Sequence, residues 1–485
     1  MKRCVLLGAI FIAVGLLFCL LPAYAADFTF ECAWQKLLSS CDTLAAWRSA
    51  TDRQKHLRQA AAMRHFPHIS VSGNYIHLSK PLTADGSKME PFASLDQEKF
   101  GAVLKNLAGT GKITPGFAKD LGVLLQSLSG QHLNTVTELS GQDIFTSALT
   151  VTWPLFTGGR IQAAEQIAEE QIRESEAQLV LARETQFTSL ARVYFGVVLA
   201  QKVLETRLEA ENGLKIHHRH AVALEKQGQI ARVERLKAQA AFDRAKVESG
   251  KARRVLEVAQ LALSQLLHLE ENVRPLNPLF VNNSLPRQEE FLRQTLATHP
   301  GLEMLRAKQE QAKGLIQVEK GLYFPQVVAL GTYNLYKPDS ILGQATPDWL
   351  AGVGLSMTLF DNQGRGRKIQ AAKSALSQVR HLYHQANRDL AVLTQKKWKE
   401  TVQAKEEFYG LESSVALAEE NVRLQEKGFS QGLFTSLDVV DARLFLESVK
   451  NQRLVASYNY VVSLAELLAL SGEPKKFMEY QTNVQ

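Results

Sequence analysis

The sequence lacks most of the features that mark enzymes, nucleic-acid-binding proteins and helical membrane proteins. Of its 485 residues only four are cysteine, and the formal charge is only +7. Because lysine and arginine are interspersed with glutamate instead of clustered, nucleic acid is not an expected partner. No nucleophile, base and orienting group occur together, so we predict no enzyme activity, catalytic residue or cofactor. After residue 25 no run of about 20 apolar residues occurs, so no second helix is expected to span a bilayer.

Two groups of histidines are weak candidates for a metal site. His217, His218 and His220 lie close together near the end of an expected helix, and His381 and His384 share one helix face. Histidines on a helix surface are usually solvated, so we predict no metal site.

The N-terminus has the pattern of a secretory signal peptide. Lys2 and Arg3 precede an apolar run from Val5 to Leu21, and a small-residue cleavage pattern ends at Ala25. These features predict a signal peptide over residues 1–25, with an uncleaved membrane anchor as the alternative. The mature chain is then expected outside the cytoplasm.

Cleavage would leave Cys32 and Cys41, and an oxidising compartment permits one disulfide between them. Nine residues of straight helix would separate their Cα atoms by about 13 Å, which a disulfide cannot bridge. The bond therefore requires a break near Ser39 and Ser40, and both outcomes stay open.

The chain contains an internal repeat. Two pairs of segments recur 204 residues apart and a third recurs 258 residues apart: Val151–Gly158 with Leu355–Asn362, Gly228–Ala238 with Gly432–Ala442, and Phe66–Tyr75 with Phe324–Tyr333. The difference predicts an insert in the first repeat. We expect a first repeat over 26–283, a second over 284–472 and a tail over 473–485, with the insert at about 78–143.

Each repeat reads as a short helix, a strand, a loop, a strand, a long helix, a break and a long helix. Apolar residues spaced by three and four predict long helices at about 160–268 and 364–470. From Arg160 to Lys226 the helix would be roughly 100 Å long. Such a helix cannot fold back into a compact globule, and its narrow apolar stripe suits side-by-side coiled-coil packing.

Four segments have the alternation of β-strands, with one apolar and one small or polar face. They are predicted at about 66–77, 144–157, 324–337 and 348–361. For a single strand the simpler interpretation is a soluble sheet with one buried face. For four such strands on a secreted chain we favour a membrane sheet, which must close into a barrel because unpaired backbone groups cannot face lipid. Since barrels start at about eight strands, closure would require partner copies.

The order, duplication and spacing of these motifs resemble the TolC family of outer-membrane efflux and secretion channels, over essentially the whole mature chain. The motifs are the two Phe-Pro strand starts at Phe66 and Phe324, the Leu-Phe junctions at Phe156 and Phe360, and the segment from Gly432 to Ala442. The resemblance implies an α+β, mainly α fold with a duplicated unit of long coiled-coil helices and four membrane strands per chain. It implies a homotrimer with a 12-stranded β-barrel and a helical tunnel, in the outer membrane and periplasm of a Gram-negative bacterium.

The resemblance also implies a function and partners. The trimer would be the outer-membrane channel of a tripartite efflux pump or type I secretion system, a passive conduit across periplasm and outer membrane. Its partners would be a periplasmic adaptor, an inner-membrane pump and outer-membrane lipid. The alternative is a periplasmic coiled-coil adaptor or scaffold without a pore. The insert would be an enlarged outer loop, either covering the pore or serving only as a connection.

Asp438 and Asp441 are the candidate site residues, because residues three apart share a helix face. The resemblance assigns them to a ring of acids at the periplasmic entrance, where threefold symmetry would bring six carboxylates together. Crowded carboxylates raise one another's pKa and attract cations. The alternative is that both are ordinary first-turn acids after a cap at Thr435 or Ser436.

The contacts that would close the entrance depart from the family pattern. Glu234 stands where family members have a gate-linking aspartate, but Phe429 and Phe434 replace their tyrosine and arginine. A polar link from Glu234 to those two positions is therefore absent. Arg232 or Arg235 would substitute, or the closed state would be held by apolar contacts.

Overall fold

The computed structural model of the chain describes residues 26–85, 108, 119, 121, 123, 136–271, 273–360 and 362–482. The predicted signal peptide and most of the predicted insert lie outside these residues. The chain divides into two compact units. The helical unit comprises Met1–Leu57, Ile167–Ala312 and Ser374–Gln485, and the strand unit comprises Arg58–Gln166 and Lys313–Lys373.

The helices repeat along the chain in the order that the sequence predicts. The short helices α2 (Phe30–Ser40) and α3 (Asp42–Ala62) recur 258 residues later as α8 (Gln288–Thr298) and α9 (Pro300–Gly321). The long helices of the first repeat are α6 (Arg160–Lys226) and α7 (Arg232–Leu266); those of the second are α11 (Arg365–Gly410), α12 (Glu412–Ser430) and α13 (Ser436–Leu470). Helices α7 and α13 are both 35 residues long. The duplicated, mainly helical α+β fold is confirmed.

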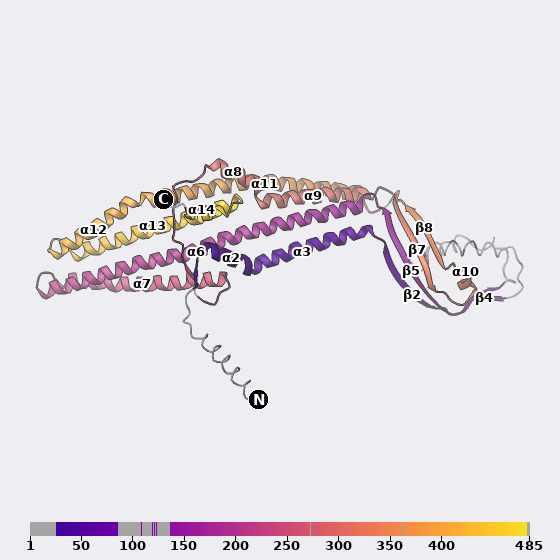
Figure 1. The fold of residues 1–485 in the computed structure, drawn as a ribbon, viewed down its shortest axis with the longest axis horizontal. Coiled ribbons are helices and arrows are strands. Elements are labelled where there is room, and N and C mark those ends of the chain that lie inside the picture. Colours follow the sequence, from indigo (N-terminus) through magenta and orange to yellow (C-terminus); the bar gives the residue numbers. More distant parts are fainter. Residues whose placement is uncertain are drawn as a thin grey trace, which may run out of the picture. The chain divides into compact units, whose positions relative to one another are not determined.

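Four antiparallel strands form the main sheet in the order β2-β5-β7-β8 (Figure 1). Their bounds are His68–His77, Asp143–Phe156, Gln326–Tyr336 and Trp349–Ser356. Val71 pairs with Leu149, Leu149 with Tyr333, and Tyr333 with Trp349. Because paired residues point to the same face, this register brings the alternating apolar side chains of all four strands together.

The apolar face of this sheet is exposed in the single chain. Trp349 is 67% exposed and Leu355 is 71% exposed, and every residue of β2 is exposed. A soluble sheet with a buried face, the simpler interpretation of one strand, does not describe this arrangement. The strands instead present a continuous apolar surface.

Strand β8 is shorter than its predicted extent of 348–361. Its last pair joins Ser356 to Gln326. The residue before Gln326 is Pro325, which has no backbone N–H to continue the ladder, so pairing stops there.

Two small sheets complete the strands. β1 (Ala26–Phe28) pairs in parallel with β6 (Val273–Pro275) in the helical unit. β3 (Leu82–Asp85) pairs antiparallel with β4 (Val136–Ser140) at the two ends of the predicted insert, in the strand unit. The short helix α10 (Ile341–Ala345) lies in the loop between β7 and β8.

An aromatic cluster forms the core of the helical unit. The rings of Phe30 and Phe477 lie 5.0 Å apart, and those of Phe30 and Tyr194 lie 5.4 Å apart. Phe477 belongs to α14 (Lys476–Thr482) and is fully buried. The segment predicted as a tail therefore includes a helix that packs into the core, because it places a large apolar ring among the others.

The two cysteines are free thiols, Cys32 exposed and Cys41 buried. Helix α2 ends at Ser40, so the expected break occurs, but only at Cys41 itself. Because Cys32 lies in the first turn of the same helix, the break comes too late to bring the two sulfurs together.

Among the residues that the structure describes, one helix, α6, is apolar enough and long enough by composition and length to cross a membrane. Length and composition alone do not distinguish a membrane span from a helix buried in a protein core, so the prediction that no second helix spans a bilayer stays a prediction. The prediction relied on the lack of a continuous apolar run, and α6 indeed has polar residues scattered among its apolar ones. Phe187, Leu190 and Tyr194 of α6 are buried in the aromatic core, which accounts for its apolar character.

Candidate functional site

The long helices form two hairpins, the first from α6 and α7 and the second from α12 and α13, and both hairpins end in the same turn. After α6, Gly228 donates to the carbonyl of Glu225 and Gln229 to that of Leu224; after α12, Gly432 donates to Phe429 and Leu433 to Gly428. This pair of hydrogen bonds is the Schellman motif, which needs a left-handed residue. Gly228 and Gly432 both have φ of 73°, so glycine at each position ends one helix and turns the chain into the next.

The N-terminus of α13 is capped by its own first turn. Thr435 Oγ1 accepts from the backbone N–H of Asp438 at 3.4 Å, and Asp438 Oδ2 accepts from the backbone N–H of Thr435 at 2.7 Å. This reciprocal pair is a capping box. The capping role that the sequence left open for Asp438 is therefore present.

Glu234 reaches across from the first hairpin to the second. Its Oε2 accepts from the backbone N–H of Ser436 at 2.8 Å, and its Oε1 pairs with Lys237 at 2.9 Å. The hydrogen bond from Lys237 lowers the pKa of Glu234, and that from Ser436 acts in the same direction. Glu234 thus binds a backbone donor of α13, a partner that does not require an arginine or tyrosine in the second hairpin.

His217 contacts the same residue. Its Nε2 lies 2.7 Å from Ser436 Oγ, and its ring lies 4.5 Å from that of Phe429. The side chain is buried, which contradicts the sequence interpretation of a solvated surface histidine. Burial lowers the pKa of His217 to about 4, and Arg443 acts in the same direction. Ser436 is therefore held from the first repeat through both its backbone and its side chain.

An apolar cluster lies beside these contacts. Phe429 is 2% exposed and packs with Ala221, Ala238 and Val439. Phe434 is 42% exposed, and its ring covers Gly428 so closely that a side chain there would collide with it. Of these two phenylalanines, only Phe429 is a buried contact between the hairpins.

The two arginines proposed as substitutes do not join the hairpins. Arg235 Nε pairs with Glu225 Oε2 at 2.6 Å, within the first hairpin. Arg232 is exposed at the start of α7. Another arginine that the sequence did not single out, Arg443 of α13, pairs with Glu426 and fills the space beside Gly213 of α6.

Asp438 and Asp441 are both exposed on the first turns of α13. Hydrogen bonds from the side chain and backbone of Thr435 lower the pKa of Asp438. On the opposite face, Val439, Val440 and Ala442 are buried. The two acids therefore share a solvent-facing side, and only Asp438 is engaged in capping.

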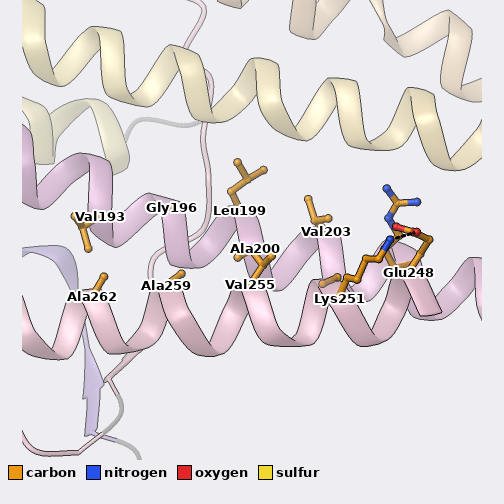
Figure 2. Close-up of a pocket in the computed structure, with 12 residues that line it drawn as sticks. Val193, Gly196, Leu199, Ala200, Val203, Glu248, Lys251, Val255, Ala259 and Ala262 are labelled. Carbon is orange, nitrogen blue, oxygen red and sulfur yellow. Dashed lines mark hydrogen bonds and ion pairs between the residues drawn. The ribbon is translucent and has the colours of Figure 1, made fainter. Parts of the chain in front are cut away.

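A groove lies between α6 and α7 along the first hairpin, with a volume of about 490 Å³. Figure 2 shows its lining of small and apolar side chains, with Lys251 and Glu248 at one end. Val255 in the lining and the nearby Val258, both of α7, are more than half exposed. The part of the chain that the structure describes contains no group of three metal-ligand side chains.

Solved structures of outer-membrane channels share this fold. The MtrE channel of Neisseria gonorrhoeae, in its open state, is 17% identical, with a TM-score of 0.69 over 93% of this chain and 91% of that chain. VceC of Vibrio cholerae is 14% identical, with a TM-score of 0.68 over 92% and 96% of the two chains. These likenesses establish the class of fold: duplicated long helices with a four-stranded sheet.

The family follows from the sequence match. The model of the outer membrane efflux protein family matches residues 122–268 and 291–473, which is more than half of the chain. The chain belongs to this family. Its class is therefore that of outer membrane efflux proteins, which locates it in the outer membrane of a Gram-negative bacterium.

Two curated relatives match a smaller part of this chain than the solved structures do. Alkaline protease secretion protein AprF of Pseudomonas aeruginosa is 22% identical over 355 residues, covering 68% of this chain and 70% of the relative. Protein CyaE of Bordetella pertussis is 26% identical over 252 residues, covering 49% of this chain. The match spans about half of CyaE, 52% of its length.

Proposed function

We propose that three copies of this chain form a passive export conduit across the outer membrane and the periplasm. The observation that carries the proposal is the main sheet, which has an exposed apolar face. Among the residues that the structure describes, β2 and β8 each leave one edge unpaired. Open edges cannot face lipid, because each unsatisfied backbone group costs several kcal/mol there.

Assembly of three copies removes these edges. Three four-stranded sheets would supply twelve strands, enough for a closed barrel. The apolar face with Val71, Leu149 and Trp349 would contact lipid, and the opposite face with Ser70, Ser72 and Asn74 would contribute to a wet lumen. The exposed apolar side chains of α7 and the groove beside them give a neighbouring copy an apolar surface to cover.

The periplasmic end of the conduit is proposed to carry an acidic constriction. Asp438 and Asp441 are exposed on one side of α13, so a threefold axis on that side would gather six carboxylates. Such a ring would attract cations and disfavour simultaneous ionisation of its members. Capping and ring formation are compatible, because the capping contacts of Asp438 use only Oδ2.

The energy for transport and the selection of cargo are assigned to partner proteins. We propose that a periplasmic adaptor binds the hairpin ends and that an inner-membrane pump supplies energy and selects cargo. Because AprF is named for alkaline protease secretion, polypeptides join drugs and small metabolites as the cargo classes to test. No step of the proposed transport requires chemistry by this chain.

The test is single-channel conductance of detergent-extracted protein in planar bilayers. Discrete, cation-selective steps are expected, and Asp441→Asn should reduce both the selectivity and the block by multivalent cations. Asp441 is the sharper choice because Asp438 also caps α13. Asp389→Asn, in the middle of α11, is the matched control. If folded trimers never conduct, the alternative of a periplasmic scaffold replaces the conduit.

A further inference from the structure

The imidazole of His217 lies at the junction of the two hairpins, where α6, α7, α12 and α13 contribute contacts. We propose that His217 is a positioning residue that makes this junction acid-sensitive: neutral His217 holds the N-terminus of α13, and protonation releases it. The inference rests on the proposed function only in treating the end of α13 as the constriction of a channel.

The contacts of His217 favour the neutral ring. Nε2 lies 2.7 Å from Ser436 Oγ. The side chain is only 3% exposed and faces the Phe429 ring, so little water is present to solvate a charge. Ser436 is also the first residue of α13, and the N-terminus of a helix carries partial positive charge. An imidazolium ion in this position would therefore be poorly stabilised.

The charged and titratable groups around the ring add to this effect. Arg443 of α13 disfavours protonation, and so do His218 and His220 of α6 itself, whereas Glu234 of α7 favours it. From α12, Glu426 pairs with Arg443 and so partly offsets that charge. Burial is the largest of these influences, and it depends on the hairpins remaining together.

The direction of the pH effect follows from linkage. In the closed junction the pKa of His217 is about 4, whereas a ring released into water would titrate near 6.5. Between these values the released state binds more protons than the closed state. Lowering the pH from about 6.5 therefore favours release, by up to about tenfold per pH unit, until the closed state also takes up the proton.

The first measurement uses the full-length protein and does not depend on conduction. In a Cys32→Ser, Cys41→Ser background, Val439→Cys places a thiol at a buried position of the junction. Its labelling by a water-soluble thiol reagent reports opening. Rates are compared between variants at each pH, which cancels the pH dependence of the thiol reaction itself.

His217→Gln is the test variant, because its amide can bond Ser436 but takes up no proton. At each pH we divide the labelling rate of the protein with His217 by that of His217→Gln. This ratio should be about tenfold higher at pH 5 than at pH 7. His384→Gln, which replaces an exposed histidine of α11 that does not act on His217, is the matched control and should keep the response of the parent. An equal ratio at pH 5 and pH 7 would overturn the inference.

His217→Leu covers the case in which His217→Gln does not fold. Leucine suits the apolar surroundings but cannot bond Ser436, so labelling at pH 7 should be faster than in the parent, and the ratio of the parent rate to the His217→Leu rate should rise as the pH falls. A ratio that stays level below pH 6.5 would overturn the role of His217.

Conductance then distinguishes a failure of the role of His217 from a failure of the channel proposal. If the parent conducts and opens more often at pH 5 while His217→Gln does not, both stand. If both proteins conduct with the same pH response, the channel stands and the role of His217 fails. If neither conducts but labelling still depends on His217, the junction is acid-sensitive and the channel proposal fails.

Discussion

The two hairpin ends have the same turn but hold it with opposite chemistry. In the first, Glu225 and Arg235 form an ion pair whose side chains are 26% and 20% exposed. The equivalent positions of the second, 204 residues later, are Phe429 and Val439, both buried in the apolar cluster. A partly exposed ion pair contributes about 0–1 kcal/mol, whereas a buried phenylalanine contributes several times more. The second end should therefore be the more firmly held of the two.

The N-termini of the following helices also differ. Helix α13 has Thr435 and Asp438 in a capping box, whereas α7 starts after Ala231 with no side-chain cap. The acid three residues into each helix is equivalent in sequence, yet Asp438 caps its own helix and Glu234 binds Ser436 of the other. The two ends thus share a backbone conformation but differ in their contacts, because Glu234 and His217 of the first repeat bind Ser436 of the second.

Removal of the buried ring should give the largest effect. Phe429→Ala is expected to destabilise the second end by about 3 kcal/mol, because it leaves a cavity among Ala221, Ala238 and Val439. Glu225→Ala, at the equivalent position of the first end, should cost at most about 1 kcal/mol. Hydrogen exchange of peptides that cover each turn measures local opening. Equal effects would show that the two ends do not differ as described.

Removal of the cap of α13, or addition of a cap to α7, should give the next largest effect. Thr435→Ala is expected to cost about 1 kcal/mol, because Asp438 N–H loses its acceptor. Ala231→Thr supplies the missing cap to α7 and should stabilise the first end by about 0.5 kcal/mol. The same exchange experiment checks both, and a loss of protection in Ala231→Thr would contradict the interpretation of α7 as uncapped.

The far ends of α7 and α13 offer a third comparison. Both helices end in a left-handed residue, His268 with φ of 54° after α7 and Gly472 with φ of 73° after α13. Because a side chain is strained in this conformation, His268→Gly should stabilise the chain by about 1 kcal/mol. Thermal unfolding followed by circular dichroism measures the gain. Gly472→Ala is the reciprocal control and should destabilise by a similar amount.

Salt should distinguish the two ends by the smallest margin. At about 1 M NaCl the Debye length is roughly 3 Å, so the attraction between Glu225 and Arg235 is screened. Exchange in the first turn should rise by less than about threefold, and exchange around Phe429 should not rise. A similar rise at both ends would point to a general effect of salt on the helices.

Much of the fold could be predicted because its signals are local. The spacing of apolar residues in α6 predicts a helix from Arg160 to Lys226, the bounds that the structure has. Alternation within four short segments predicts strands with one apolar face, and the register of the sheet brings those faces together. The equivalence of Glu234 and Asp438 follows from the repeat alone.

The limits of prediction appear where a partner decides the outcome. The end of β8 depends on Pro325 in the neighbouring strand, and the helical character of the predicted tail depends on an aromatic core assembled from distant segments. The sequence showed that Glu234 lacked an arginine or tyrosine partner, but not that a backbone N–H at Ser436 would be within reach.

The sequence by itself determined the duplication, the long helices, the four strands and the positions of the candidate acids, because periodicity and motif spacing are properties of consecutive residues. Only the tertiary structure decided that His217 is buried, that Arg235 stays within its own hairpin and that Ser436 is held by two residues of the other repeat. Burial and hydrogen bonding depend on which distant side chains meet, and no local pattern contains that information.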